Sequence, residues 1–93
     1  MLSSERKNEK MNVLIVDDDK LFIRKVLEGI DWEAIGVSRV FSAEDMQQAC
    51  RILETFSIAI VVTDVEMARG NGLELLNWIS EKKLPVETLV VSG

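Results

Sequence analysis

Two apolar segments of this chain run directly into aspartate residues. The segment at residues 13–16 is followed by Asp17 and Asp18, and the segment at residues 58–63 is followed by Asp64. Carboxylates that lie close together repel one another and raise each other's pKa unless a cation joins them. Magnesium suits such a site, because it binds a few carboxylate or carbonyl oxygens and keeps several waters. The three aspartates are therefore candidate metal ligands.

Two further residues belong to the same set of candidates. Glu66 stands two residues beyond Asp64, where its backbone carbonyl or side chain would reach the same metal. Ser92 follows the apolar segment at residues 86–91 and adds a hydroxyl group at another strand end. Ordinary structural roles compete with these interpretations, because aspartate and serine also form turns. Asp19 in particular is expected to cap the helix that follows it.

Composition narrows the classes of function that the chain can have. Its 93 residues are enough for one domain, and its net charge of −5 makes it a poor binder of nucleic acid. The sequence has no histidine, so any metal should be a hard cation held by oxygen atoms. A single cysteine, Cys50, allows no disulfide within the chain, and no apolar run approaches membrane-spanning length. We expect a cytoplasmic protein that does not enter the membrane.

Strand and helix patterns alternate along the chain. Residues 1–11 are polar and without periodicity, so we expect a disordered tail, followed by a folded domain at residues 12–93. Apolar runs predict the strands, and apolar residues spaced three and four apart predict the helices. The predicted strands are residues 13–16, 37–41, 58–63 and 86–91; the predicted helices are residues 20–29, the stripe Met46, Ala49, Cys50 and Leu53, and residues 73–83.

Local signals predict how these elements begin and pack. Ser42 with Asp45 three residues later has the pattern of a capping box at the start of the second helix. The sequence Gly-Asn-Gly at residues 70–72 is interpreted as a break between strand and helix. The side chains expected to pack in the core or against it are Trp32, Met46, Cys50, Met67 and Trp78.

An alternating order of strands and helices with short connections predicts an α/β fold with a doubly wound parallel sheet. In the common strand order 2-1-3-4, the first and third strands are neighbours. Ligands of such sheets bind beyond the carboxyl ends of the strands. Asp17, Asp18 and Asp64 should therefore meet in one pocket.

Three segments resemble the receiver domains of bacterial two-component response regulators. VLIVDDDK at residues 13–20 is similar to their first strand and acidic pair, and IVVTDVEMARGNGLELL at residues 60–76 to the segment that carries their phosphorylated aspartate. LVVSG at residues 89–93 is similar to their fourth strand with its serine or threonine. GIDWEAIGVSRV, residues 29–40, also resembles regulators in which a receiver precedes a helix-turn-helix DNA-binding module.

The resemblance implies a three-layer, flavodoxin-like fold and a role for each candidate residue. Asp64 would accept a phosphoryl group from the phosphohistidine of a sensor histidine kinase. Asp17 and Asp18 would position Mg²⁺, and Asp64 together with the backbone carbonyl of Glu66 would complete the protein ligands. Ser92 would contact the phosphoryl oxygens and switch with the phosphorylated state. The implied domain is not an enzyme, and it would reach DNA only through a domain not present in this chain.

The chain departs from the pattern of the receiver family in three places. Ala68 stands where receivers usually have proline, and Asn71 replaces a frequent aspartate. A fifth strand with a lysine is expected after the fourth, so we expect the domain to be incomplete at its C-terminus. Without that strand, residues 89–91 would form an exposed apolar edge, and we expect either self-association through it, as in a homodimer, or only marginal stability.

Two other functions are compatible with parts of the pattern. One is a receiver-like module for interaction or dimerisation that works without phosphorylation, an interpretation that Ala68 and the absent lysine favour. The other is a phosphatase of the haloacid-dehalogenase type, whose first strand is followed by an Asp-x-Asp motif such as Asp17-Asp18-Asp19. That motif expects threonine two residues later, and Leu21 stands there instead.

Overall fold

The computed structural model describes residues 11–67 and 70–91, so Ser92, Ala68 and nearly all of the predicted tail lie outside the described residues. Strands and helices alternate along the described chain, as predicted. In order, the elements are β1 (Met11–Val16), α2 (Lys20–Gly29), the short 3₁₀ helix η1 (Glu33–Ile35), β2 (Val37–Ala43), α3 (Met46–Thr55), β3 (Ile60–Asp64), α4 (Gly72–Lys82) and β4 (Glu87–Val91).

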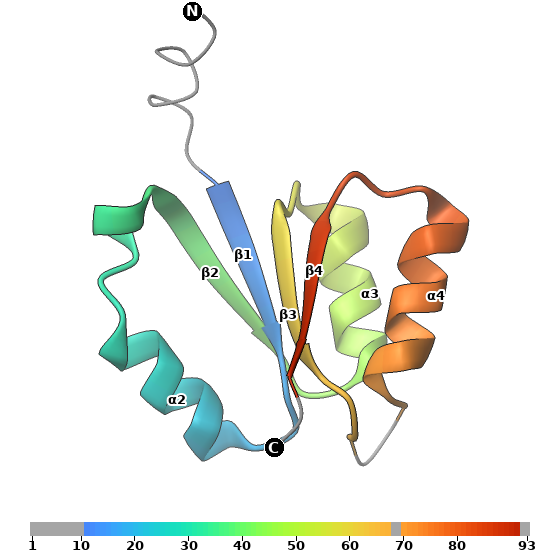
Figure 1. Ribbon diagram of the computed structural model, residues 1–93, viewed down its shortest axis with the longest axis horizontal. Helices are drawn as coiled ribbons and strands as arrows, with labels where there is room; N and C mark the ends of the chain where they lie inside the picture. The colour runs from blue at the N-terminus through green and yellow to red at the C-terminus, as the bar shows by residue number, and fades with distance from the viewer. Residues whose placement is uncertain (1–10, 68–69, 92–93) are drawn as a thin grey trace, which may run out of the picture.

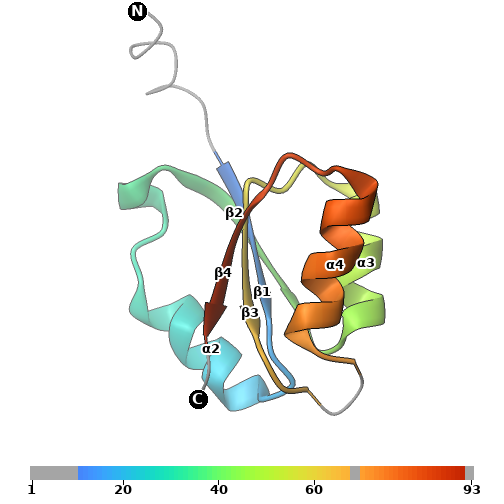
Figure 2. The same ribbon diagram turned by 45° about the vertical axis from the view of Figure 1, so that its right-hand side comes forward.

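The four strands form one parallel sheet in the order β2-β1-β3-β4. Helix α2 covers one face of the sheet, and α3 and α4 lie side by side on the other face (Figure 1). The same three layers are evident when the molecule is turned (Figure 2). This arrangement confirms the predicted three-layer, doubly wound α/β fold and its strand order 2-1-3-4.

The central strand β1 is buried on both faces, which explains its unbroken apolar sequence. Leu14 and Val16 pack in the larger core cluster together with residues of α3 and α4. Val13 and Ile15 belong to the smaller cluster, in which Ile23 of α2 also packs. Successive side chains of a strand point to opposite faces, so β1 contributes to both layers of the core.

The first helix starts as predicted. The side chain of Asp19 caps α2 by accepting hydrogen bonds from the backbone N–H groups of Leu21 and Phe22, at 3.0 and 3.2 Å. The carboxylate thereby satisfies two of the N–H groups that a helix leaves without a partner in its first turn. Asp19 is thus confirmed as a structural cap.

The prediction that a capping box at Ser42 starts the second helix is wrong, because the helix begins about one turn later. Ser42 lies in β2, and the cap of α3 is Asp45, whose Oδ1 accepts a hydrogen bond from the Gln48 N–H at 2.9 Å. The Gln48 side chain in turn accepts from the Glu44 N–H at 2.8 Å. Strand pairing with β1 keeps β2 extended as far as Ala43, and the helix therefore starts later than the local sequence signal indicates.

Other element boundaries differ from the predictions by a few residues. Strand β1 begins at Met11, which the sequence analysis assigned to the tail, whereas β3 begins only at Ile60. The 3₁₀ helix η1 was not predicted. The expected packing residues are all partly buried against the two core clusters: Met46, Cys50, Met67 and Trp78 against the larger, and Trp32 against the smaller.

No helix within residues 11–67 and 70–91 is long and apolar enough to cross a membrane.

Candidate functional site

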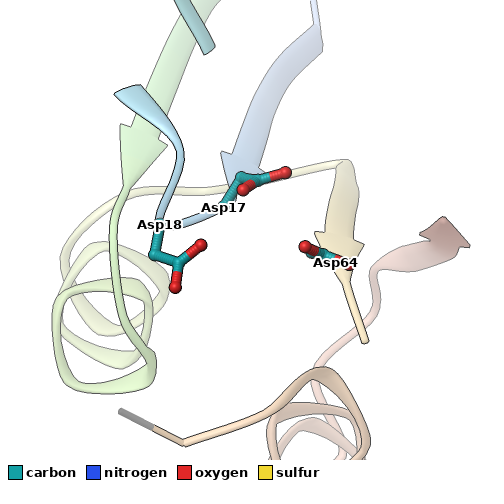
Figure 3. A group of neighbouring side chains, drawn as sticks. All are labelled: Asp17, Asp18 and Asp64. Carbon is teal, nitrogen blue, oxygen red and sulfur yellow. The ribbon is translucent and has the colours of Figure 1, made fainter. Parts of the chain in front are cut away.

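The sheet brings the aspartates together because β1 and β3 pair directly. Val16 of β1 is in register with Thr63 of β3, so the residues that follow each of them, Asp17 and Asp64, leave the sheet side by side. Figure 3 shows Asp17 and Asp18 on the segment after β1, facing Asp64 at the end of β3. The predicted meeting of the three aspartates at the carboxyl edge of the sheet is therefore observed.

Each of the three aspartates can offer one carboxylate oxygen within 4.8 Å of the oxygens offered by the other two. Asp17 is buried, Asp64 is half-buried and Asp18 is exposed. The cluster is consequently anchored in the protein on one side and open to solvent on the other. A cation in such a position would contact the carboxylates and keep part of its water shell, as magnesium prefers.

Burial is the largest influence on the Asp17 carboxyl group, and it raises the pKa of that group above its ordinary value. The negative charges of Asp64 and Asp18 raise the pKa further. A hydrogen bond from the Asp19 N–H to Asp17 Oδ1, 2.9 Å long, acts in the opposite direction by stabilising the ionised form. The balance leaves a buried carboxylate that a cation would stabilise.

The donor set fits a magnesium ion. All three side chains offer hard, anionic oxygen atoms, and the described part of the chain gathers them in a single group of this kind. Their mutual repulsion is unfavourable in the absence of a counter-charge, and it adds to the larger effect of burial in raising the pKa of Asp17. The predicted set of Asp17, Asp18 and Asp64 is thus arranged as a hard-cation site requires.

The two remaining predicted site residues are Glu66 and Ser92. Glu66 lies on the β3–α4 connection with an exposed side chain, and its backbone forms an isolated antiparallel bridge with Asn71. Ser92 lies outside the described residues. The last residue of β4, Val91, accepts a hydrogen bond from the Val65 N–H at 3.2 Å, so β4 ends beside the residue that follows Asp64.

Two residues at the site were missed by the sequence analysis. The hydroxyl group of Thr63 donates a hydrogen bond to the carbonyl oxygen of Asp64, and Gly72 lies against the backbone of Asp64. Thr63 was interpreted only as a strand residue and Gly72 only as part of a break. Gly72 could have been noticed from the sequence because it is a glycine at the first position of a helix. Residues with a side chain are normally tolerated at that position.

Comparison with known protein families gives one match across most of the chain. The family model described as the response regulator receiver domain matches residues 13–93, which include both strand ends that carry the aspartates.

Individual relatives agree with this match. The transcriptional regulatory protein YesN of Bacillus subtilis is 31% identical over 81 residues, which are 87% of this chain and 22% of YesN. This chain therefore spans less than a quarter of the length of that relative. Among solved structures, the two component transcriptional regulator AraC from Clostridium phytofermentans ISDg has a TM-score of 0.82 and 30% identity, over 90% of this chain and 68% of that chain. The MaeR response regulator bound to beryllium trifluoride has a TM-score of 0.75 and 29% identity. This match covers 89% of this chain and 67% of the MaeR chain.

Proposed function

The chain belongs to the response regulator receiver domain family of two-component systems, and from this premise we propose that it is a phosphoacceptor domain with Asp64 as the acceptor. The proposed donor is the phosphohistidine of a sensor histidine kinase, and we place this exchange in the cytoplasm. Asp17, Asp18, Asp64 and the backbone carbonyl of Glu66 are the proposed ligands of Mg²⁺.

One observation carries this proposal. Three carboxylates from two adjacent strand ends lie within 4.8 Å of one another, although their charges oppose that arrangement. A structural role alone would not require such a cluster, because the helix cap at this position is supplied by Asp19. A cluster that costs stability in the metal-free chain is expected where function requires the charges.

The proposed chemistry needs only an ionised carboxylate as nucleophile. A carboxylate oxygen of Asp64 attacks phosphorus and forms a P–O bond, while the P–N bond of the phosphohistidine breaks. The electron pair of that bond stays on the imidazole nitrogen, which takes up a proton from solvent. Asp64 needs no general base, which agrees with the lack of histidine in the sequence. Bound Mg²⁺ would neutralise charge between the nucleophile and the phosphoryl group.

The phosphorylated domain is proposed to signal through a change in charge. An acyl phosphate adds negative charge and acceptor oxygens at the carboxyl edge of the sheet. Ser92 is the proposed group that moves to meet these oxygens and so reports the modified state. The similar regulators YesN and AraC are transcriptional regulators, so the proposed output is a DNA-binding domain outside this chain.

The test is the intact mass of the protein after incubation with Mg²⁺ and acetyl phosphate. We expect the parent chain to gain a single phosphoryl group, and Asp64→Asn to gain none, because the amide is not a nucleophile. Asp31→Asn is the matched control, since Asp31 is an exposed aspartate whose carboxylate accepts a hydrogen bond from the Ala34 N–H. It should be phosphorylated like the parent.

Three outcomes would contradict the proposal. A parent chain that binds no Mg²⁺ and gains no phosphoryl group would favour the alternative of a module that works without phosphorylation. Continuous release of inorganic phosphate from phosphate esters would point instead to a phosphatase of the haloacid-dehalogenase type. Phosphorylation of Asp64→Asn would move the acceptor to another residue.

A further inference from the structure

The backbone carbonyl of Asp64 is held by the side chain that precedes it. Thr63 is fully buried, and its Oγ1 donates a hydrogen bond to the Asp64 carbonyl oxygen at 3.1 Å. A buried hydroxyl group needs such a partner, because leaving it without one is costly. The hydroxyl group of Thr63 and the carbonyl group of Asp64 therefore fix each other at the end of β3.

Gly72 closes on the same carbonyl group from the start of α4. A Cβ atom built on Gly72 would overlap the Asp64 carbonyl oxygen, and it would lie 3.1 Å from the carbonyl carbon and 3.2 Å from Val65 Cα. Carbon atoms in contact normally lie about 3.5–4.0 Å apart, so a side chain at this position would require a shift on the order of 1 Å. All three neighbouring atoms belong to the backbone, which cannot yield as a flexible side chain does.

Hydrogen bonds also hold the N–H side of this peptide group and the carbonyl of the peptide group that follows it. The N–H of Val65 donates to the Val91 carbonyl of β4 at 3.2 Å, and the Val65 carbonyl accepts from the Gly72 N–H at 2.9 Å. Backbone contacts thus hold both sides of the peptide unit between Asp64 and Val65. The Asp64 side chain is attached at one end of this unit, and Val65 joins its other end to Glu66, so a displacement of the unit is expected to shift both the Asp64 carboxylate and the Glu66 backbone.

We propose that Thr63 and Gly72 are positioning residues, which orient the Asp64 carboxylate and the Glu66 carbonyl by clamping the peptide group between Asp64 and Val65. This inference rests on the proposed function for its kinetic consequence. Its structural consequence, a fixed peptide group, does not depend on phosphorylation.

Gly72→Ala tests the steric half of the clamp, and Gly29→Ala is its matched control. Gly29 ends α2, and a Cβ atom there would meet nothing within 4 Å. We expect phosphorylation of Gly72→Ala by acetyl phosphate to slow by about 10- to 100-fold at saturating Mg²⁺ and saturating donor, since misplacement by about 1 Å costs this much. Gly29→Ala should react at the parental rate.

Thr63→Val tests the hydrogen-bonding half. Valine keeps the volume of threonine and removes the hydroxyl group, so we expect the rate to fall about 3- to 10-fold. Thr63→Ser restores the hydroxyl group and should recover most of the rate. Thr88→Val makes the same change at an exposed position of β4 and should leave the rate unchanged.

Two further measurements separate positioning from a loss of folding. The thermal midpoint of each variant shows the temperature range in which it is folded, and rates are compared only within that range. The ¹H–¹⁵N amide shifts of Asp64, Val65 and Glu66 report the peptide group directly, and Mg²⁺ titrated alone by calorimetry reports the ligand geometry. We expect these amide shifts to change in Gly72→Ala and the dissociation constant for Mg²⁺ to rise several-fold.

The outcomes distinguish this inference from the proposed function. If the parent chain is not phosphorylated, the proposed function fails, and the amide shifts still decide whether the clamp exists. If the parent is phosphorylated and folded Gly72→Ala and Thr63→Val match it in rate, Mg²⁺ affinity and amide shifts, the clamp is overturned. Equal losses in Thr63→Ser and Thr63→Val would also overturn the role of the hydroxyl group.

Discussion

Asp17 is the residue at which the demands of folding and of metal binding conflict most directly. Its side chain is 7% exposed, and it shares the site with Asp18 and Asp64. Burial and these neighbouring charges raise the pKa of its carboxyl group above the ordinary value of 3.8. At neutral pH the ionised group therefore destabilises the metal-free folded chain, and a bound cation would reverse this effect.

We predict that Asp17→Asn stabilises the chain when Mg²⁺ is removed with a chelator. The amide keeps an oxygen for the Asp19 N–H and removes one negative charge, so the free energy of unfolding should rise at pH 7. A raised pKa means that this gain is present above the folded-state pKa, and it should vanish as pH falls towards 3.8, where the carboxyl group is protonated.

Urea unfolding with chelator and with excess Mg²⁺ measures both effects of Asp17→Asn. Adding Mg²⁺ should stabilise the parent in proportion to the logarithm of its concentration above the dissociation constant, and the variant much less. Equal stabilisation of parent and variant by Mg²⁺ would show that Asp17 is not a ligand. Asp31→Asn, which is remote from the cluster, should behave like the parent in both conditions.

The three α-helices of the described residues all begin after an aspartate or asparagine cap. These caps are Asp19 for α2, Asp45 for α3 and Asn71 for α4, and each accepts a hydrogen bond from an N–H of the first turn. Asp19 directly follows Asp18 in the sequence, and Asn71 forms an isolated bridge with Glu66, which follows Asp64 by two residues. At these positions helix initiation and the geometry of the site thus depend on the same few residues.

Asp45→Ala is predicted to lower the free energy of unfolding by about 1–2 kcal/mol. The side chain is 8% exposed and caps α3, and replacing such a cap with alanine typically costs this much. Asp45→Asn keeps the accepting oxygen and should lose little. The measurement is urea unfolding followed by circular dichroism.

Ser42→Ala is the control that separates the observed cap from the one expected from sequence. Ser42 is exposed in β2, so its replacement should change the free energy of unfolding by no more than about 0.5 kcal/mol. A larger loss for Ser42→Ala than for Asp45→Ala would favour the original capping-box interpretation.

The two edges of the described sheet differ in how they are protected. At the β2 edge, the guanidinium group of Arg39 lies 4.6 Å from the centre of the Phe41 ring and 5.3 Å from that of Phe56. At the β4 edge, Leu89 is paired with Val62 and remains 55% exposed. An exposed apolar edge strand is a template for pairing with another chain. The β4 edge is therefore where we predict that the 93-residue chain associates with itself.

We predict that Leu89→Lys shifts the chain towards monomer, because a charged side chain on an edge strand disfavours pairing with a second sheet. Sedimentation velocity over a range of concentrations measures this shift. Leu73→Lys is the matched control, since Leu73 is 58% exposed and lies on the helix α4 rather than on an edge strand. A parent chain that is monomeric at every concentration would contradict the predicted association.

The sequence by itself determined the order of elements, the parallel sheet and the set of aspartates. Apolar runs such as residues 13–16 are long enough to identify a strand buried on both faces, and the chain order of such strands restricts the topology to a few choices. Once β1 and β3 are neighbours, Asp17 and Asp64 must leave the sheet together, because the ends of parallel strands meet at one edge.

Only the tertiary structure decided where elements start and which backbone groups lie against the site. Strand pairing extends β2 to Ala43 and so moves the cap of α3 from Ser42 to Asp45, an effect that a local pattern does not contain. The contact between Gly72 and Asp64 joins residues eight positions apart through the packing of a helix start on a strand end. Local propensity is a property of neighbouring residues, whereas this contact exists only after β3 and α4 have been placed in three dimensions.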